Sequence, residues 1–250
     1  MKTLPLILAA TALIATGACN KKAGTGASTP AATSEPTVAV TPPADGDWSQ
    51  VTTPSTAGGF IMGNPNAKVK LVEYGSMTCP HCGEFDKVGA KPLIDNYVKN
   101  GKVSWEFRNF VRDPYDLAAS LVARCNGPKS FFGLTRALYA AQPEWVGKLQ
   151  KVSQPQMEAL QKLPPQQQFV QIGALTGFPE FAALRGVPVA KANACLADDK
   201  EVSKLVQMNS DAVTQYNIPG TPSFLINGAL LDETATWELL EPKLKTAIGS

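Results

Sequence analysis

The motif Cys-Pro-His-Cys at residues 79–82 restricts the possible folds of this chain more than any other feature. It follows an apolar, β-branched run at residues 69–74, which is typical of a buried strand. Apolar side chains then recur at helical spacing over residues 85–98, and Gly101 is a suitable end for that helix. Residues 103–108 alternate between apolar and polar side chains, which predicts a half-buried strand. The cysteine pair therefore lies where a strand meets a helix, and a second strand follows.

A long helical segment interrupts the strands. Residues 113–216 begin with Asp113-Pro114, an N-cap followed by proline in the first turn, and hold about 100 residues without a convincing strand. Residues 222–226 then predict a short strand, Asn227-Gly228 a type I′ hairpin turn, and residues 237–248 a closing helix. Strands that flank a purely helical stretch indicate an α/β domain with an all-helical insertion.

Composition excludes several classes of protein. With 44% hydrophobic and 18% charged residues, the 250-residue chain can bury a sizeable core and is not globally disordered. The net charge is only +2 and no basic run exceeds Lys21-Lys22, so we expect no nucleic-acid partner. Outside the N-terminus, no segment approaches the roughly 20 apolar residues of a membrane-spanning helix. Reactive residues are few, with five cysteines and one histidine, and we expect no cofactor.

The N-terminus has the pattern of an export signal. Lys2 precedes an apolar run over residues 4–14, and small residues then lead to Cys19. We expect residues 1–18 to be a signal peptide. The small residues before Cys19 resemble a bacterial lipobox, which implies that Cys19 is lipidated and, because Asn20 follows it, favours the outer membrane. Cleavage further upstream, with Cys19 unmodified, is the alternative.

The segment behind that cysteine is poor in residues that could pack. Ala, Thr, Pro, Ser and Gly dominate it, and such a composition cannot bury enough apolar surface to offset chain entropy. We therefore expect residues 19–59 to be a flexible, lipid-anchored linker, and the folded part to begin near Phe60. The chain should touch a membrane only through the anchor.

The cysteine pair suits redox chemistry. At the start of a helix, backbone N–H groups and the positive end of the helix dipole stabilise the thiolate of Cys79. Pro80 fits the first turn, where its missing N–H costs nothing. His81, the only histidine, can donate to the Cys79 sulfur or lie near it as a cation. Cys79 is thus the expected nucleophile and Cys82 the cysteine that resolves a mixed disulfide.

Two other readings of the pair are open. A Cys-x-x-Cys motif can be half of a structural zinc site, but such a site needs a second half with comparable spacing, and the other cysteines are isolated. The pair could also form a purely structural ring disulfide. The setting between strand and helix, with a histidine between the cysteines, favours a redox role over both, and we expect no metal site.

Together, Cys-Pro-His-Cys after a Val-Glu-Tyr strand and Gly220-Thr221-Pro222 before a strand resemble the DsbA family of thiol:disulfide oxidoreductases. The resemblance implies an α/β thioredoxin fold, in two parts at residues 60–112 and 217–250, with the helical domain 113–216 inserted between them. It implies that Glu73, six residues before Cys79, is a buried acid that exchanges a proton with Cys82. It also implies that Pro222 is a cis-proline and that the Thr221 backbone binds substrate beside Cys79.

The resemblance predicts a protein of the periplasm or cell envelope that passes its Cys79–Cys82 disulfide to reduced exported proteins. A membrane redox partner is expected to reoxidise it, and no dimerisation domain is recognisable, so we expect a monomer. A threonine at position 221 is more usual among the isomerase and reductase relatives, and these roles stay as alternatives. A non-catalytic holdase chaperone and a copper or zinc carrier are alternatives from other classes.

The two remaining cysteines predict a second disulfide. An odd number of cysteines is unusual in an exported protein, but with Cys19 lipidated and Cys79 paired with Cys82, only Cys125 and Cys195 are left. Both lie in the helical segment. We expect a structural disulfide between them, and two buried reduced thiols are the alternative.

Overall fold

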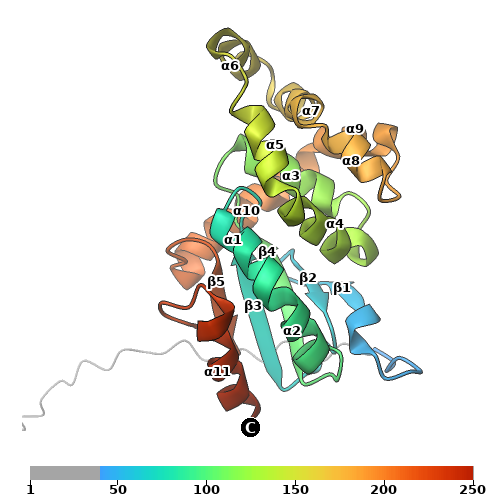
Figure 1. Cartoon of the computed structure of the whole chain (residues 1–250), viewed down its shortest axis with the longest axis vertical. Coiled ribbons are helices and arrows are strands. Elements are labelled where there is room, and N and C mark those ends of the chain that lie inside the picture. The colour runs from blue at the N-terminus through green and yellow to red at the C-terminus, as the bar shows by residue number, and fades with distance from the viewer. Residues whose placement is uncertain (1–39, 250) are drawn as a thin grey trace, which may run out of the picture. The chain divides into compact units, whose positions relative to one another are not determined.

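The computed structural model describes residues 40–249, which form a six-stranded mixed sheet and helices on both of its faces (Figure 1). The strand order is β1-β2-β4-β3-β5-β6, and β3 and β4 are parallel while all other neighbours are antiparallel. The strands are β1 (Thr52–Pro54), β2 (Phe60–Met62), β3 (Val69–Gly75), β4 (Val103–Asn109), β5 (Ser223–Ile226) and β6 (Ala229–Leu230).

One helical run leads from β3 to β4 and begins at the cysteine pair. It consists of α1 (Pro80–Phe85), η2 (Asp86–Ala90), α2 (Lys91–Leu93) and η3 (Ile94–Val98), of which η2 and η3 are π-helical. The π-helical turns lie on both sides of Pro92, which has no N–H to donate to an α-helical hydrogen bond. Because β3 and β4 are parallel, this run crosses over one face of the sheet.

The helical insertion begins directly after β4, as predicted. Asp113 caps α3 by accepting hydrogen bonds from the N–H groups of Tyr115 and Asp116. Figure 1 shows most of these helices gathered at one end of the sheet, before α10 returns along it to β5. The helices are α3 (Pro114–Arg124), α4 (Pro128–Ala140), α5 (Gln142–Leu149), α6 (Gln154–Gln161), α7 (Pro165–Thr176), α8 (Phe178–Ala183), α9 (Val189–Leu196) and α10 (Asp199–Tyr216).

Aromatic side chains join the insertion to the sheet. Phe131 on α4 packs against Phe60 of β2 and Phe107 of β4, with ring centroids 4.4 and 5.5 Å apart. The opposite face of the sheet is covered by the end of α10, where Ala212 packs with Val72 of β3 in a separate apolar cluster. The closing helix α11 (Trp237–Ile248) packs against β3 and β5. The insertion therefore shares the core of the sheet.

Strand β4 is buried on both faces, and the predicted half-buried strand is wrong in this respect. Its alternating polar residues, Glu106 and Arg108, are 6% and 5% exposed. They form an ion pair through hydrogen bonds of 2.7 and 2.9 Å, and Arg108 also donates to the Tyr74 hydroxyl. The Arg108 guanidinium lies over the Tyr216 ring of α10 as well. Because these charges satisfy each other, the polar face of β4 can be covered by α10.

The folded part starts before Phe60, so the linker predicted up to residue 59 is too long. The short helix η1 (Trp48–Gln50) is capped by Asp47, and the Trp48 N–H donates to the Lys99 carbonyl. Strand β1 then pairs with β2 along its whole length. The Trp48 ring fills the space beside Gly101, where an added Cβ would lie 2.8 Å from it.

The predicted signal peptide, Cys19 and the linker up to residue 39 lie outside the described residues. Within residues 40–249, every helix is too short or too polar to cross a membrane.

Two local predictions in the folded part agree with the structure. Asn227 and Gly228 both have positive φ, 50° and 83°, and join β5 to β6 as the hairpin signal predicts. Cys125 at the end of α3 and Cys195 on α9 form the expected disulfide, which links helices 70 residues apart.

Candidate active site

Cys79 lies where β3 ends and α1 begins. It is the N-cap of α1, with extended backbone angles, and Pro80 is the first helical residue, as the motif predicts. Cys82 is one turn further along the helix, so its sulfur faces the same side as that of Cys79. Both cysteines are free in this structure, and they are 2% and 0% exposed. Both cysteines are thus nearly inaccessible to solvent, and Cys79 is the more accessible of the two.

The surroundings favour the thiolate of Cys79. The Cys82 thiol donates to its sulfur, and the backbone N–H groups of Cys82 and His81 add to this, so that the pKa of Cys79 is lowered to about 5 although burial acts against it. These N–H groups belong to the first turn of α1, which has no earlier carbonyl to receive them. The His81 side chain is exposed, so the group of this residue that acts on the sulfur is its N–H.

The surroundings of Cys82 favour its protonated thiol instead. Burial raises the pKa of its thiol well above 9, and the nearby charges of Cys79 and Glu73 raise it further. Its sulfur accepts one hydrogen bond, from the Ser76 N–H at 3.5 Å. In the reduced pair the negative charge is therefore on Cys79 and the proton on Cys82.

Glu73 is buried in β3, at 1% exposure, as the sequence predicts. Burial raises the pKa of its carboxyl well above 4.5, and the charge of Asp86 raises it too, whereas a 3.0 Å hydrogen bond from Trp105 Nε1 lowers it. The Glu73 and Cys82 charges act on one another, so an ionised Glu73 disfavours a Cys82 thiolate. This carboxyl can therefore hold a proton in the core next to the buried sulfur.

Thr221 and Pro222 lie opposite Cys79, and the peptide bond between them is cis, as predicted. The Cys79 sulfur lies 3.2 Å from the Thr221 carbonyl oxygen, to which its thiol form can donate. Strand β5 begins at Ser223 and pairs with β3, and this pairing brings the two residues to the end of β3 where Cys79 lies. Together these contacts form one site from residues 142 positions apart in the sequence.

The residues before Cys79 are held by side chains that the sequence did not single out. Asp116 of α3 is fully buried and accepts from Ser76 Oγ at 2.5 Å and from the Met77 N–H at 2.8 Å, and burial raises its pKa to about 7. Gln142 of α5 donates to backbone carbonyls of the same loop. Only Asp113, which accepts from Thr78 Oγ1 at 2.9 Å, had a signal in the sequence, its N-cap position.

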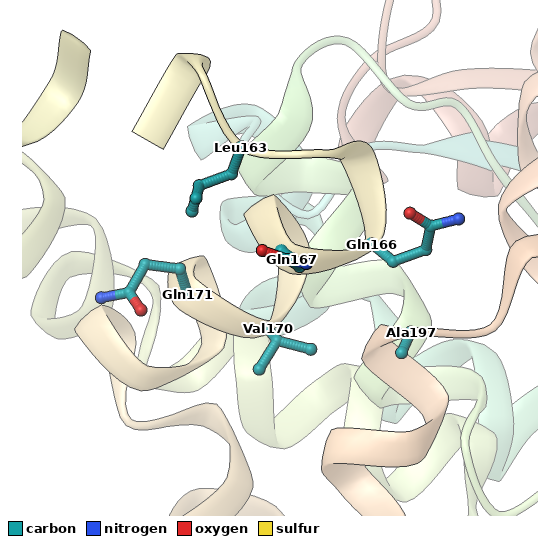
Figure 2. Close-up of a pocket in the computed structure, with 6 residues that line it drawn as sticks. All are labelled: Leu163, Gln166, Gln167, Val170, Gln171 and Ala197. Carbon is teal, nitrogen blue, oxygen red and sulfur yellow. The ribbon is translucent and has the colours of Figure 1, made fainter. Parts of the chain in front are cut away.

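A pocket far along the insertion is unrelated to this site. Figure 2 shows its lining side chains on and around α7 and at the start of the α9–α10 connection, none of which belongs to the redox pair or its neighbours. Its lining residues are Leu163, Gln166, Gln167, Val170, Gln171 and Ala197.

Known proteins share this arrangement. A family model described as Thioredoxin matches residues 55–246, which is most of the chain. The chain belongs to this thioredoxin family. Within it, the order of strands and helices is that of the DsbA-like members, so the predicted α/β fold with an inserted helical domain is confirmed.

Two solved structures show how far the similarity of this thioredoxin-family chain extends. A protein-disulfide isomerase from Novosphingobium aromaticivorans is 35% identical, with a TM-score of 0.73 over 76% of this chain and 97% of that one. The Wolbachia pipientis protein α-DsbA1 is 21% identical, with a TM-score of 0.63 over 78% and 94%, and shares the fold.

Curated relatives are less similar in sequence than the Novosphingobium protein. A Rickettsia bellii protein provisionally named a protein-disulfide oxidoreductase is 29% identical over 170 residues, or 68% of this chain. The chain spans only 57% of that relative's length. Disulfide bond formation protein D of Bacillus subtilis is 22% identical over 202 residues, which cover 77% of this chain and 80% of that protein.

Proposed function

We propose that this chain is a thiol:disulfide oxidoreductase that donates the Cys79–Cys82 disulfide to thiols of exported proteins. The observation that carries the proposal is the asymmetry of the pair, since the pKa of Cys79 is lowered to about 5 and that of Cys82 is raised well above 9. A thiol of low pKa is the better leaving group, and a stabilised thiolate makes the disulfide form the stronger oxidant. The names of its relatives support the same chemistry.

The reaction proceeds through a mixed disulfide. A client thiolate attacks the Cys79 sulfur, the more exposed of the two, and the bond between Cys79 and Cys82 breaks while Cys82 leaves with the electron pair and takes up a proton. A second client thiolate then attacks the client sulfur, and Cys79 leaves as a thiolate. The client loses two electrons and gains a disulfide, and the Cys79–Cys82 pair is reduced.

Other residues of the site have supporting roles in this proposal. Glu73 supplies the proton that Cys82 takes up, because burial raises the pKa of its carboxyl and so favours its protonated form. Thr221 and Pro222 present a backbone carbonyl next to Cys79, to which an extended client segment can hydrogen bond. Pro80 and His81 form the exposed rim of the first helical turn, over which the client passes.

The protein would work in the cell envelope and be reoxidised there. The export signal at residues 1–18 and lipidation of Cys19 would place the chain, as a monomer, in the periplasm on a membrane anchor, preferably at the outer membrane. There a membrane redox partner accepts two electrons from the reduced pair and restores the disulfide.

Isomerase or reductase activity is the second candidate. The observation in its favour is the 35% identity to a structure named a protein-disulfide isomerase, over 97% of that chain. An isomerase acts in its reduced form, whose Cys79 thiolate attacks a wrong client disulfide and leaves when the correct bond has formed. The same sulfur serves both roles, so the direction depends on the reduction potential of the pair.

Oxidative refolding of a reduced model protein tests the proposal. The oxidised wild type should form client disulfides with equal loss of its own, whereas Cys79→Ser should form none. A holdase would keep its effect in the Cys79→Ser variant, and that result would reject the enzymatic function. Wild type that only accelerates refolding of a scrambled, fully oxidised client would favour the isomerase.

A further inference from the structure

The loop before the active-site helix, residues 76–79, is held by the helical insertion. Asp113 and Asp116 of α3 bind the hydroxyl groups of Thr78 and Ser76. Tyr139 of α4 donates to the Ser76 carbonyl at 3.2 Å. These contacts bind Ser76 and Thr78, three residues and one residue before the reactive cysteine. They therefore fix the conformation of the loop that leads into the helix.

Gln142 alone among these side chains binds Cys79 itself. It is the first residue of α5 and is 7% exposed. Its Nε2 donates to the Met77 carbonyl at 2.7 Å and to the Cys79 carbonyl at 3.0 Å. One carboxamide thus connects two backbone carbonyls on either side of Thr78, across 65 and 63 residues of sequence.

The Cys79 carbonyl also belongs to the helix. It accepts the first hydrogen bond of α1, from the Gly83 N–H at 3.2 Å, while the Cys79 backbone is extended with φ −82° and ψ 119°. Rotation of this peptide plane would turn the Cys79 side chain relative to the N–H groups of the first turn. The direction from which those groups meet the sulfur therefore depends on how firmly the Cys79 carbonyl is held.

We propose that Gln142 is a positioning residue, which holds Cys79 in the N-cap conformation in which the first turn of α1 stabilises its thiolate. The insertion would then contribute to the redox chemistry as well as to the fold. This inference deepens the proposed function of the same site and rests on it.

Gly83 leaves the space that this contact needs. An added Cβ at this position would lie 3.1 Å from Gln142 Oε1 and 3.6 Å from its Cδ. The carboxamide is buried and bonded at its other end, so a methyl group here would press it away from the two carbonyls. Alanine otherwise favours a helix over glycine, which makes Gly83→Ala a probe of the contact from the opposite side.

The test is a titration of the Cys79 thiolate, followed by its absorbance near 240 nm in the reduced full chain. Gln142→Met keeps a side chain of similar length without the donors. We expect it to raise the pKa of Cys79 by about one unit, a tenfold loss of thiolate relative to thiol. Thr176→Val is the control, because it removes a buried hydroxyl that donates within α7 of the insertion and should lower stability without moving this pKa.

Gly83→Ala provides the second measurement if Gln142→Met does not fold. It should also raise the pKa of Cys79. Where Gln142→Met does fold, adding Gly83→Ala to it should cause little further change. Folded variants whose Cys79 pKa equals that of the wild type would overturn the inference. The titration needs no client, so a protein that fails the refolding assay but shows these shifts rejects the proposed function and keeps the role of Gln142.

Discussion

At the scale of single residues, the structure gives two cysteines with the same side chain two different acidities. The difference arises from position, because Cys79 caps a helix and Cys82 faces the core. Glu73 follows the same rule, since a carboxyl with one hydrogen bond in the core is costly to ionise. The motif predicts the cysteines from their place at the junction of a strand and a helix, and the resemblance to the DsbA family predicts Glu73, six residues before Cys79. It cannot predict Gln142 or Asp116, which reach the site through contacts across 39 to 65 residues.

The Cys79 thiolate should make the stability of the reduced protein depend on pH. Its pKa in the folded chain, about 5, is below the ordinary value of 9.0, so the stabilisation is complete above pH 9 and is lost as the pH falls towards 5. We expect the free energy of unfolding of the reduced form to rise more steeply with pH in this window than that of Cys79→Ala. Urea unfolding at several pH values measures it, and parallel curves for the two proteins would contradict the assignment.

Glu73→Gln should slow the proton-coupled step at Cys82. The amide cannot deliver a proton, so the rate at which the mixed disulfide forms should fall by about a hundredfold. The rate is measured by rapid mixing of oxidised protein with a reduced peptide. Glu84→Gln is the control, because Glu84 is an exposed carboxyl two residues after Cys82 and should leave the rate unchanged.

The same Glu73→Gln variant should be more stable than the wild type at high pH. The folded pKa of Glu73 is raised, so the wild type has its full stability only below pH 4.5 and loses part of it as the pH rises and the buried carboxyl is forced to ionise. Glutamine has no such loss. A stability difference between the two proteins that stays the same from pH 4 to pH 9 would contradict the raised pKa of Glu73.

At the scale of elements, the sequence predicts the pieces with a local cause. The hairpin at Asn227-Gly228 needs positive φ at both residues, and the start of α3 needs the Asp113 cap. Strand β1 was missed because three residues, Thr52–Pro54, carry no hydrophobic period, and their pairing with β2 is a tertiary contact. The burial of Glu106 and Arg108 was missed because their ion pair is covered by α10, about 100 residues later.

The disulfide between α3 and α9 should stabilise the insertion. Replacing Cys125 and Cys195 together by alanine should lower the free energy of unfolding by roughly 4 kcal/mol, the loop-entropy estimate for so long a loop. Thermal unfolding measures the loss, and the pKa of Cys79 should not change. Mass analysis after alkylation without reductant should leave both cysteines unlabelled, and labelling of both would refute the bond.

At the scale of the whole molecule, the stability of the fold depends on the segment before Phe60, which holds η1 and β1. A chain that begins at residue 60 loses β1 and the Trp48 ring beside Gly101, whereas one that begins at residue 40 keeps both. We expect the shorter chain to be less stable by about 2 kcal/mol, because the half-buried Trp48 ring loses its apolar contact and β1 no longer covers β2. Guanidinium unfolding of the two chains measures the difference, and equal midpoints would show that the region 40–59 is dispensable.

The loop that carries the reactive sulfur, residues 76–79, is also where the insertion is hydrogen-bonded to the segment that follows β3. The outer helices of the insertion make none of these contacts, so their length and surface can vary without moving the loop. The start of α3 and the first residue of α5 cannot vary in this way, because their side chains are hydrogen-bonded to residues 76–79. A helical domain from another protein, placed at this position, would need side chains equivalent to Asp113, Asp116 and Gln142. Without them the loop would shift and the pKa of Cys79 would change.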